Sequence, residues 1–186
     1  MNDFMYYNPT KIEFGRGKEK NNGKYIKEAG YDSVLLVYGT GSITRSRVYD
    51  DTIASLTNSG IVYEELDGVV SNPLLSRVYD GIKIAKEHKL QAVLGVGGGS
   101  VADSVKAIAA GAKYEGDVWD FFIQKAQITE ALPVFTVMTL AATASEMNGN
   151  SVVMNDETKQ KYSIASVLVN PVLSVINPEL MATVSK

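Results

Sequence analysis

The sequence predicts a single α/β domain over residues 1–186, built on a Rossmann-like, doubly wound, mostly parallel sheet. Short apolar runs recur along the chain, and most are followed by a segment with apolar residues at the 3–4 spacing of a helix. Two of these runs end in glycine clusters, which are typical of tight turns. The chain contains no linker, repeat or low-complexity segment, and its length suits one domain. Strands that alternate with helices form right-handed βαβ units and therefore a parallel sheet.

The strands are expected where apolar residues follow one another without a helical period, because parallel strands are buried on both faces. They are residues 33–38, 61–66, 92–96, 133–138 and 172–176. The 3–4 spacing predicts helices around residues 48–56 and 74–85 and from the second glycine cluster to residue 111, after a polar first helix at 18–29. Residues 5–14, with a central Asn-Pro, are expected to form an extended lead-in.

The pattern changes near the C-terminal end. Residues 151–154 and 162–169 flank the turn sequence Asn-Asp-Glu-Thr, which predicts a β-hairpin. Residues 179–186 resemble the opening of a helix that stops, so the chain is interpreted as cut at this end.

Composition and charge argue against several classes of protein. A net charge of −3 without a basic block argues against a protein that coats nucleic acid. No run reaches the roughly 18 apolar residues of a membrane span, and the first residues carry no secretion signal. A cytoplasmic protein is therefore expected, without nucleic acid or membrane as a partner. The chain has no cysteine, and its one histidine, His88, is expected on the surface, so this chain alone cannot form a histidine-based metal site.

The most informative segment joins the third expected strand to its helix. Gly97, Gly98 and Gly99 occupy this turn, and the first N–H groups of the following helix lack intrahelical partners. Those groups and the positive end of the helix dipole form a site for phosphate, which glycine allows to approach the backbone. The alternative is a plain turn with a capping box, in which Ser100 is the N-cap and Asp103 is its partner. We favour the phosphate site, because a plain turn needs only one glycine.

A second glycine-rich segment, Gly39-Thr40-Gly41-Ser42, follows the first expected strand. Loops at the carboxyl ends of parallel strands line the crevice in which ligands bind. A conventional Rossmann arrangement would place a pyrophosphate on this segment and a ribose on Glu64 or Glu65, about 20 residues later. We favour the triple-glycine segment as the phosphate site and interpret the two glutamates as the polar tail of a strand.

Hydroxyl side chains follow the strand expected at 133–138. Thr139, Thr143 and Ser145 could donate hydrogen bonds to a ribose or a phosphate, but threonine and serine also cap helices, and the sequence does not decide between these roles. Lys159 and Lys161 in the hairpin are interpreted as solvated charges unless the hairpin folds over the crevice.

Residues 97–107, GGGSVADSVKA, resemble the GGGSxxDxAK signature of the iron-containing (group III) alcohol dehydrogenases. Three further segments agree in order and spacing. Residues 8–15 resemble the family's N-terminal strand, and Asn72-Pro73 falls where the family has an Asn-Pro pair. Residues 139–148 are similar to the segment after the third cofactor strand in the butanol dehydrogenase-like branch. The resemblance covers the whole chain as an N-terminal, dinucleotide-binding domain.

The resemblance implies the cofactor-binding part of an enzyme that transfers hydride between a nicotinamide and a small primary alcohol or aldehyde. The resemblance places three groups of residues around the cofactor. At the pyrophosphate signature these would be Gly97, Gly98, Gly99, Ser100 and Asp103; along the adenine and ribose, Thr139, Leu140 and Thr143; and facing the adenosine 2′ position, Gly39, Thr40, Gly41 and Ser42. Asn72 would lie near the adenosine, and Lys161 (or Lys159 if the register slips) would lie near the nicotinamide. Family members that prefer NAD carry an aspartate in the loop that faces the 2′ position. Small and hydroxyl residues here favour NADP(H), with NAD possible.

The resemblance also implies a divalent metal, iron or zinc, held by an aspartate and three histidines in a helical C-terminal domain that this chain lacks. The chain alone is then expected to bind cofactor without turnover, and a homodimer is possible. Asn177 and Ala144 stand where the family more often has aspartate and glycine. Two other functions remain open. One is a lyase like 3-dehydroquinate synthase, which shares the fold but is disfavoured by residues 139–148; the other is a non-enzymatic nucleotide-binding fragment.

Overall fold

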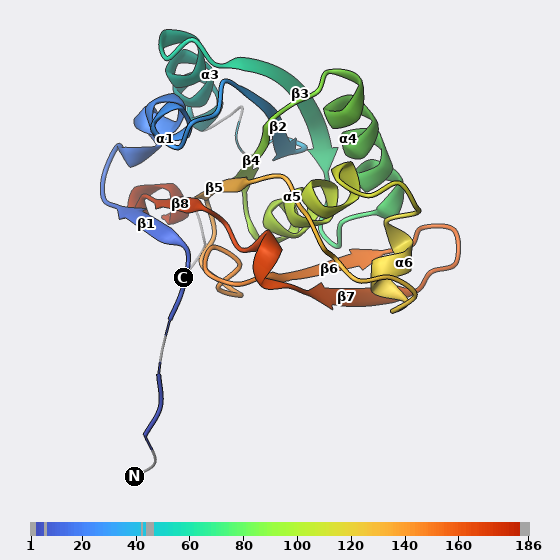
Figure 1. Ribbon diagram of the computed structural model, residues 1–186. Coiled ribbons are helices and arrows are strands. Elements are labelled where there is room, and N and C mark those ends of the chain that lie inside the picture. The colour runs from blue at the N-terminus through green and yellow to red at the C-terminus, as the bar shows by residue number, and fades with distance from the viewer. Residues whose placement is uncertain (1–2, 6, 42, 44–46, 183–186) are drawn as a thin grey trace.

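The computed structural model describes residues 3–5, 7–41, 43 and 47–182, and it confirms the predicted fold class. One sheet has the strand order β1-β8-β5-β4-β2-β3, and every neighbouring pair in it is parallel (Figure 1). The strands are β1 (Lys11–Phe14), β2 (Ser33–Gly39), β3 (Val62–Val69), β4 (Ala92–Gly97), β5 (Val134–Met138) and β8 (Leu173–Ile176). The edge strand β1 lies within the extended lead-in expected at residues 5–14.

Helices cover both faces of the sheet. The bounds are α1 (Asn22–Glu28), α3 (Val48–Asn58), α4 (Leu75–Glu87), α5 (Gly99–Ala112) and the short α6 (Trp119–Phe122). Side chains of β2 alternate between the faces: Val34 and Leu36 join the apolar cluster that contains residues of α1 and α3, while Leu35 and Val37 join the cluster on the α4 and α5 side. The sheet is therefore doubly wound. Within the part of the chain that the structure describes, no helix is long and apolar enough to cross a membrane.

The predicted hairpin is present and is shorter than expected. Strands β6 (Asn150–Met154) and β7 (Lys161–Ala165) pair antiparallel and lie beside α5 (Figure 1). Val153 and Ile164 are buried in the same apolar cluster as α5. The second arm was expected to reach residue 169, but Val167–Val169 forms the 3-10 helix η2, because the Ser166 hydroxyl accepts a hydrogen bond from the Leu168 amide.

Other element boundaries also differ from the sequence prediction. The first helix is split into the 3-10 helix η1 (Lys18–Asn21) and α1, and β3 continues to residue 69 rather than 66. The 3-10 helix η3 (Pro178–Met181) follows β8, and the Asn177 side chain caps it. The aromatic segment after α5 contains the single helical turn α6. These changes leave the alternating βα order intact.

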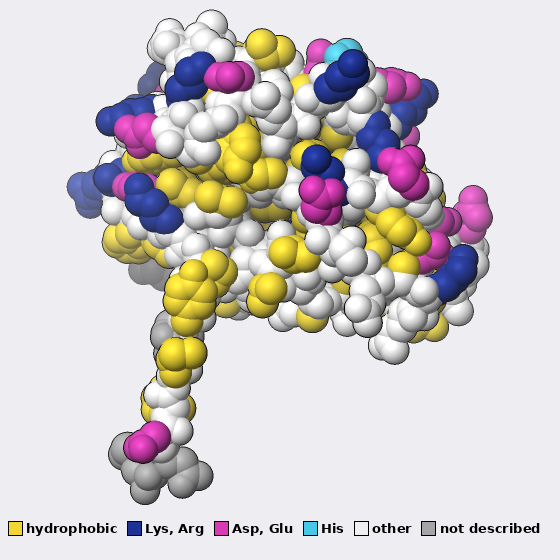
Figure 2. All heavy atoms as spheres, viewed as in Figure 1, with side chains coloured by type: hydrophobic (Ala, Val, Ile, Leu, Met, Phe, Trp, Pro, Cys, Tyr) yellow, Lys and Arg dark blue, Asp and Glu magenta, His cyan; other side chains and the backbone are white. Residues whose placement is uncertain are grey.

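The chain before β1 extends away from the body of the protein (Figure 1). Phe4, Met5 and Tyr7 on this arm are 86%, 91% and 79% exposed, and Figure 2 shows the row of apolar side chains along it. Their apolar surfaces face solvent in the isolated chain.

Candidate nucleotide site

The strand order brings the carboxyl ends of β2 and β4 together. β2 lies between β3 and β4, and Tyr38 is in register with Val96 near the ends of the two strands. The order β3-β2-β4-β5-β8 corresponds to the 2-1-3-4-5 order of doubly wound proteins, whose ligands bind where the strand order reverses. Both glycine-rich segments predicted from the sequence therefore lie at this reversal point.

A cavity of about 410 Å³ opens at this point. Of the predicted site residues, those lining it are Gly39, Thr40, Gly41, Gly97, Gly98, Gly99, Ser100 and Leu140. Ser42 lies outside the described residues. The sequence reasoning missed Ile43, Val101 and the segment 69–71, which also line the cavity. Segment 69–71 was missed because β3 was expected to end at residue 66, although the Asn72-Pro73 break indicated where the chain turns.

The N-terminus of α5 faces this cavity. Gly98 is the N-cap, and its carbonyl oxygen accepts hydrogen bonds from the amides of Val101 and Ala102, both at 3.1 Å. The amides of Gly99 and Ser100 precede these first intrahelical bonds and are free of helical partners. Ser100 was expected as the N-cap in the capping-box interpretation. That interpretation is wrong, because the extended backbone of Gly98 starts the helix earlier and no side chain caps it.

Each of the three glycines has a different neighbour. A Cβ atom on Gly97 would lie 2.6 Å from Val101 Cγ2, which is too close for carbon atoms. A Cβ on Gly98 would touch Leu140 Cβ at 3.4 Å, and one on Gly99 would approach Thr143 Oγ1 at 3.2 Å. Packing against Val101 is therefore enough to require Gly97. Gly98 and Gly99 have no side chain that would occupy the cavity next to Leu140 and Thr143.

The hydroxyl-rich segment after β5 packs against this helix end as an irregular loop, residues 139–149. The Thr139 amide donates to the Gly97 carbonyl oxygen at 2.9 Å, and the hydroxyls of Thr143 and Ser145 are hydrogen-bonded at 2.8 Å. The segment leads directly into β6, with no helix in it. The helix-capping alternative for Thr139, Thr143 and Ser145 is therefore wrong, and Thr143 lies over the first residue of α5.

Asp103, near the start of α5, and Lys161, on β7, interact electrostatically. Burial raises the pKa of Asp103 to about 6, an effect opposed by Lys106, the Val152 amide and Lys161. Lys161 Nζ also donates to Asn72 Oδ1 at 2.6 Å. Lys161 and Asn72 were expected at the nicotinamide and adenosine ends, but this bond places their side chains together. Neither residue lines the cavity at the reversal point.

The hairpin register distinguishes the two candidate lysines. Lys161 is in β7, paired with Met154, whereas Lys159 lies in the turn and its Nζ donates to the carbonyl oxygen of Asp156. Lys159 contacts its own turn, and Lys161 is the lysine that reaches the Asn-Pro segment. The alternative with a slipped register is not observed.

Glu64 and Glu65 lie in the middle of β3 rather than at its end. The Glu65 carboxylate accepts hydrogen bonds from the hydroxyls of Tyr38 and Tyr49, and Glu64 Oε1 lies 3.1 Å from His88 Nδ1. Both carboxylates have protein partners. A ribose contact at Glu64 or Glu65 is therefore not supported.

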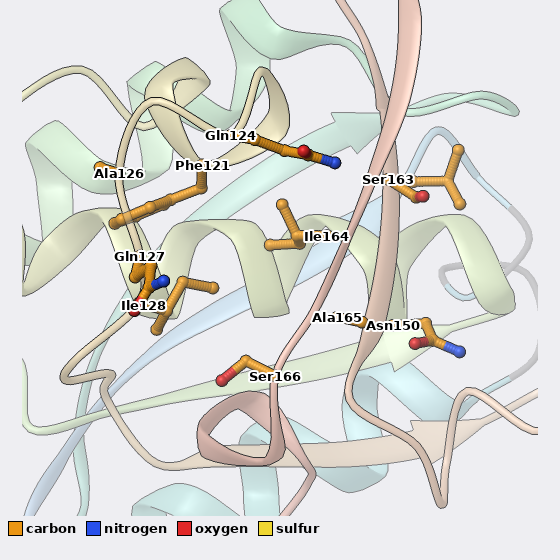
Figure 3. A pocket seen from close by; sticks show the side chains of 11 residues that line it. Phe121, Gln124, Ala126, Gln127, Ile128, Asn150, Ser163, Ile164, Ala165 and Ser166 are labelled. Carbon is orange, nitrogen blue, oxygen red and sulfur yellow. The ribbon is translucent and has the colours of Figure 1, made fainter.

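A larger cavity of about 900 Å³ lies away from this site, between residues 121–128 and the hairpin. Figure 3 shows Phe121 and Ile128 on one side and Ile164 on the hairpin. None of its lining residues carries a formal charge or belongs to the predicted site. The smaller cavity, with its helix N-terminus, is the better phosphate site.

In the described part of the chain, no three His, Cys, Asp or Glu side chains are grouped so that they could hold a metal ion. The family resemblance implies a metal held by residues outside this chain, and that expectation stays a prediction.

The fold and the reversal-point cavity together define a Rossmann-like α/β protein. The family described as iron-containing alcohol dehydrogenase matches residues 9–178, and the chain belongs to this family. It is 51% identical over 186 residues to the probable NADH-dependent butanol dehydrogenase 1 of Bacillus subtilis (strain 168), an alignment that covers 100% of this chain and 48% of the relative. It is 34% identical over 181 residues to the NADPH-dependent aldehyde reductase YqhD of Escherichia coli (strain K12), covering 96% of this chain and 46% of the relative.

A solved structure agrees with these matches. The NADH-dependent butanol dehydrogenase A of Thermotoga maritima superposes with a TM-score of 0.96 at 51% identity, over 100% of this chain and 46% of that chain. The chain therefore spans about half the length of the relatives it matches. The family resemblance inferred from the glycine-rich signature is confirmed.

Proposed function

We propose that the chain is the dinucleotide-binding half of a nicotinamide-dependent alcohol dehydrogenase or aldehyde reductase that acts on small primary alcohols and aldehydes. The observation that carries this proposal is the cavity at the reversal point, where two glycine-rich loops meet the N-terminus of α5. A bound nicotinamide cofactor would supply the hydride chemistry. The residues of this chain would bind and orient it.

The amides of Gly99 and Ser100 would donate to the pyrophosphate, aided by the dipole of α5. The Thr143 hydroxyl, next to Gly99, would add a donor on the side of the loop 139–149. Lys161 and Asn72 would contact the ligand where it passes the hairpin. This arrangement needs no side chain of the larger cavity.

The cofactor type is proposed from the loop after β2. Gly39, Thr40 and Gly41 line the cavity without a carboxylate, which would otherwise repel a 2′-phosphate. Relatives are named for both cofactors, NADH for the Bacillus subtilis protein and NADPH for the Escherichia coli one. We propose that the chain binds NADPH with preference and also accepts NADH.

Fluorescence titration of the purified chain with NADPH and NADH tests the proposal. Saturable binding is expected for both, tighter for NADPH. Thr40→Asp should weaken the binding of NADPH at least tenfold and leave the binding of NADH nearly unchanged, because only NADPH carries a 2′-phosphate that the new carboxylate would repel. Lys113→Met, an exposed change at the far end of α5, is the control.

The outcomes separate the alternatives. Tighter NADH binding would overturn the cofactor preference and leave the dehydrogenase assignment standing. Absence of binding to both would contradict the nucleotide site in this chain. Alcohol-dependent NADPH formation by the chain alone would contradict the proposal that it is only the binding half, and activity on a 3-dehydroquinate synthase substrate would favour the lyase.

A further inference from the structure

Lys106 is fully buried, and the other buried residues of α5 are apolar or small. Burying an ammonium group is costly unless it is hydrogen-bonded. Its Nζ donates to Asn148 Oδ1 at 3.1 Å and to the Asn150 carbonyl oxygen at 3.0 Å. Both acceptors lie where the loop 139–149 joins β6. Lys106 therefore links this part of the loop to α5 through hydrogen bonds.

Asn148 extends this connection toward the cavity. Its Oδ1 also accepts from the Asn150 amide at 3.0 Å, and its Nδ2 donates to the Thr143 carbonyl oxygen at 3.1 Å. The Thr143 hydroxyl is the atom that a Cβ on Gly99 would approach at 3.2 Å. A series of hydrogen bonds therefore runs from the interior of α5 through Asn148 to Thr143, whose hydroxyl lies near Gly99, the first residue of the same helix.

The charged groups that act on Lys106 lie on α5 and in the loop 139–149. Asp103 on α5 and Glu146 in the loop favour its ammonium form, and Lys161 on β7 acts on Asp103. Burial nevertheless lowers the pKa of Lys106 to about 8. At neutral pH its two hydrogen bonds are charge-assisted, and they lose that assistance as pH rises through about 8.

We propose that Lys106 is a positioning residue, whose buried ammonium holds residues 143–150 in the conformation that places Thr143 at the dinucleotide site. The inference rests on the proposed function. Two other bonds anchor the far side of the loop, from Asn8 Nδ2 to the Met147 carbonyl oxygen and from Ser174 Oγ to that of Glu146, both at 2.7 Å. Loss of the lysine should therefore loosen the loop locally without unfolding the domain.

Hydrogen exchange of the ligand-free chain tests the positioning directly. Lys106→Met keeps the length of the side chain and removes its hydrogen bonds, and Asn148→Ala breaks the same connection without touching the helix. Both variants should increase exchange in peptides covering residues 143–150, while peptides of β4 stay unchanged. Lys113→Met, the same substitution at the exposed end of α5, should have no effect. Unchanged exchange of residues 143–150 in both test variants would overturn the inference, whether or not cofactor binds.

Cofactor binding supplies the second measurement. Each test variant should bind the preferred cofactor, NADPH or NADH, about tenfold more weakly than the wild type. This is the size expected from losing a charge-assisted hydrogen bond. The double variant should be little weaker than either single one, because both changes break the same connection. Binding by the wild type should also weaken between pH 7 and 9.5, and this pH dependence should vanish in Lys106→Met.

The failures are distinguishable. If the wild type binds cofactor and both Lys106→Met and Asn148→Ala bind it with the same affinity, the positioning role is overturned and the proposed function stands. A wild type that binds neither cofactor would contradict the proposed function, and the exchange experiment would still decide whether Lys106 holds the loop. If Lys106→Met fails to fold, Asn148→Ala alone decides.

Discussion

At the scale of single residues, Asn177 and Ala144 have surroundings that predict the effect of substituting them. Asn177 is 2% exposed, and its Nδ2 donates to the buried Glu19 carboxylate at 3.0 Å while its Oδ1 accepts from the Glu179 amide. An aspartate in its place would set two carboxylates against each other. The asparagine is therefore matched to Glu19, which lies far away in the sequence.

Asn177→Asp is expected to destabilise the chain by roughly 3 kcal/mol at pH 7, because it buries two facing negative charges and removes a donor. Urea denaturation at pH 7 measures the loss. Glu19→Gln in the same protein should recover most of it, since the amide can donate to the new carboxylate. Equal stability of Asn177→Asp and wild type would show that the bond to Glu19 contributes nothing.

Ala144 adopts a left-handed backbone with φ of +52°, a conformation that glycine adopts without strain. Ala144→Gly should raise the free energy of unfolding by about 0.5–1 kcal/mol, the relief of strain less the extra unfolded-state entropy of glycine. The melting temperature should rise by about 2 °C. Ala142→Gly is the control, because Ala142 is exposed, lies in the same loop and has no positive φ; it should leave the melting temperature unchanged or lower it. A lower melting temperature for Ala144→Gly would contradict the explanation.

At the scale of elements, the turn between β4 and α5 combines a packing requirement with an open surface. Gly97 faces Val101 on the following helix, and Gly98 faces Leu140 across the cavity. The two glycines are adjacent in the sequence but serve different purposes. A substitution at each position can separate these purposes.

Gly97→Ala should destabilise the chain by about 1–3 kcal/mol, because its Cβ would overlap Val101. Gly98→Ala should fold normally, because its Cβ would make an ordinary contact, and it should weaken dinucleotide binding by narrowing the cavity. Thermal melting and NADPH titration of both variants check these outcomes. Normal binding by Gly98→Ala would mean that the phosphate does not approach this part of the turn.

At the scale of the whole molecule, the site is assembled from segments far apart in the chain. The loops after β2, β3, β4 and β5 converge because their strands are parallel and share one carboxyl edge. The loop 139–149 is held from three sides, by Asn8 before β1, by Lys106 in α5 and by Ser174 in β8. These contacts depend on the completed sheet.

Local patterns of apolar residues and glycine were enough to predict the fold class, five of the six strands of the sheet and a helix that begins at the triple glycine. Those patterns did not predict how far β3 extends or that an irregular loop comes after β5. Hydrogen bonds between segments far apart in the sequence fix these features, and a local pattern of residues does not contain them.

The partners of individual side chains depend on the tertiary fold alone. In the folded chain, Lys161 donates a hydrogen bond to Asn72, and two tyrosine hydroxyls donate to the Glu65 carboxylate. Lys106 is buried and donates to Asn148 in the loop. A side-chain partner across the fold leaves no periodic signal in the sequence, because such a bond requires two distant segments to meet at the right distance and orientation in space.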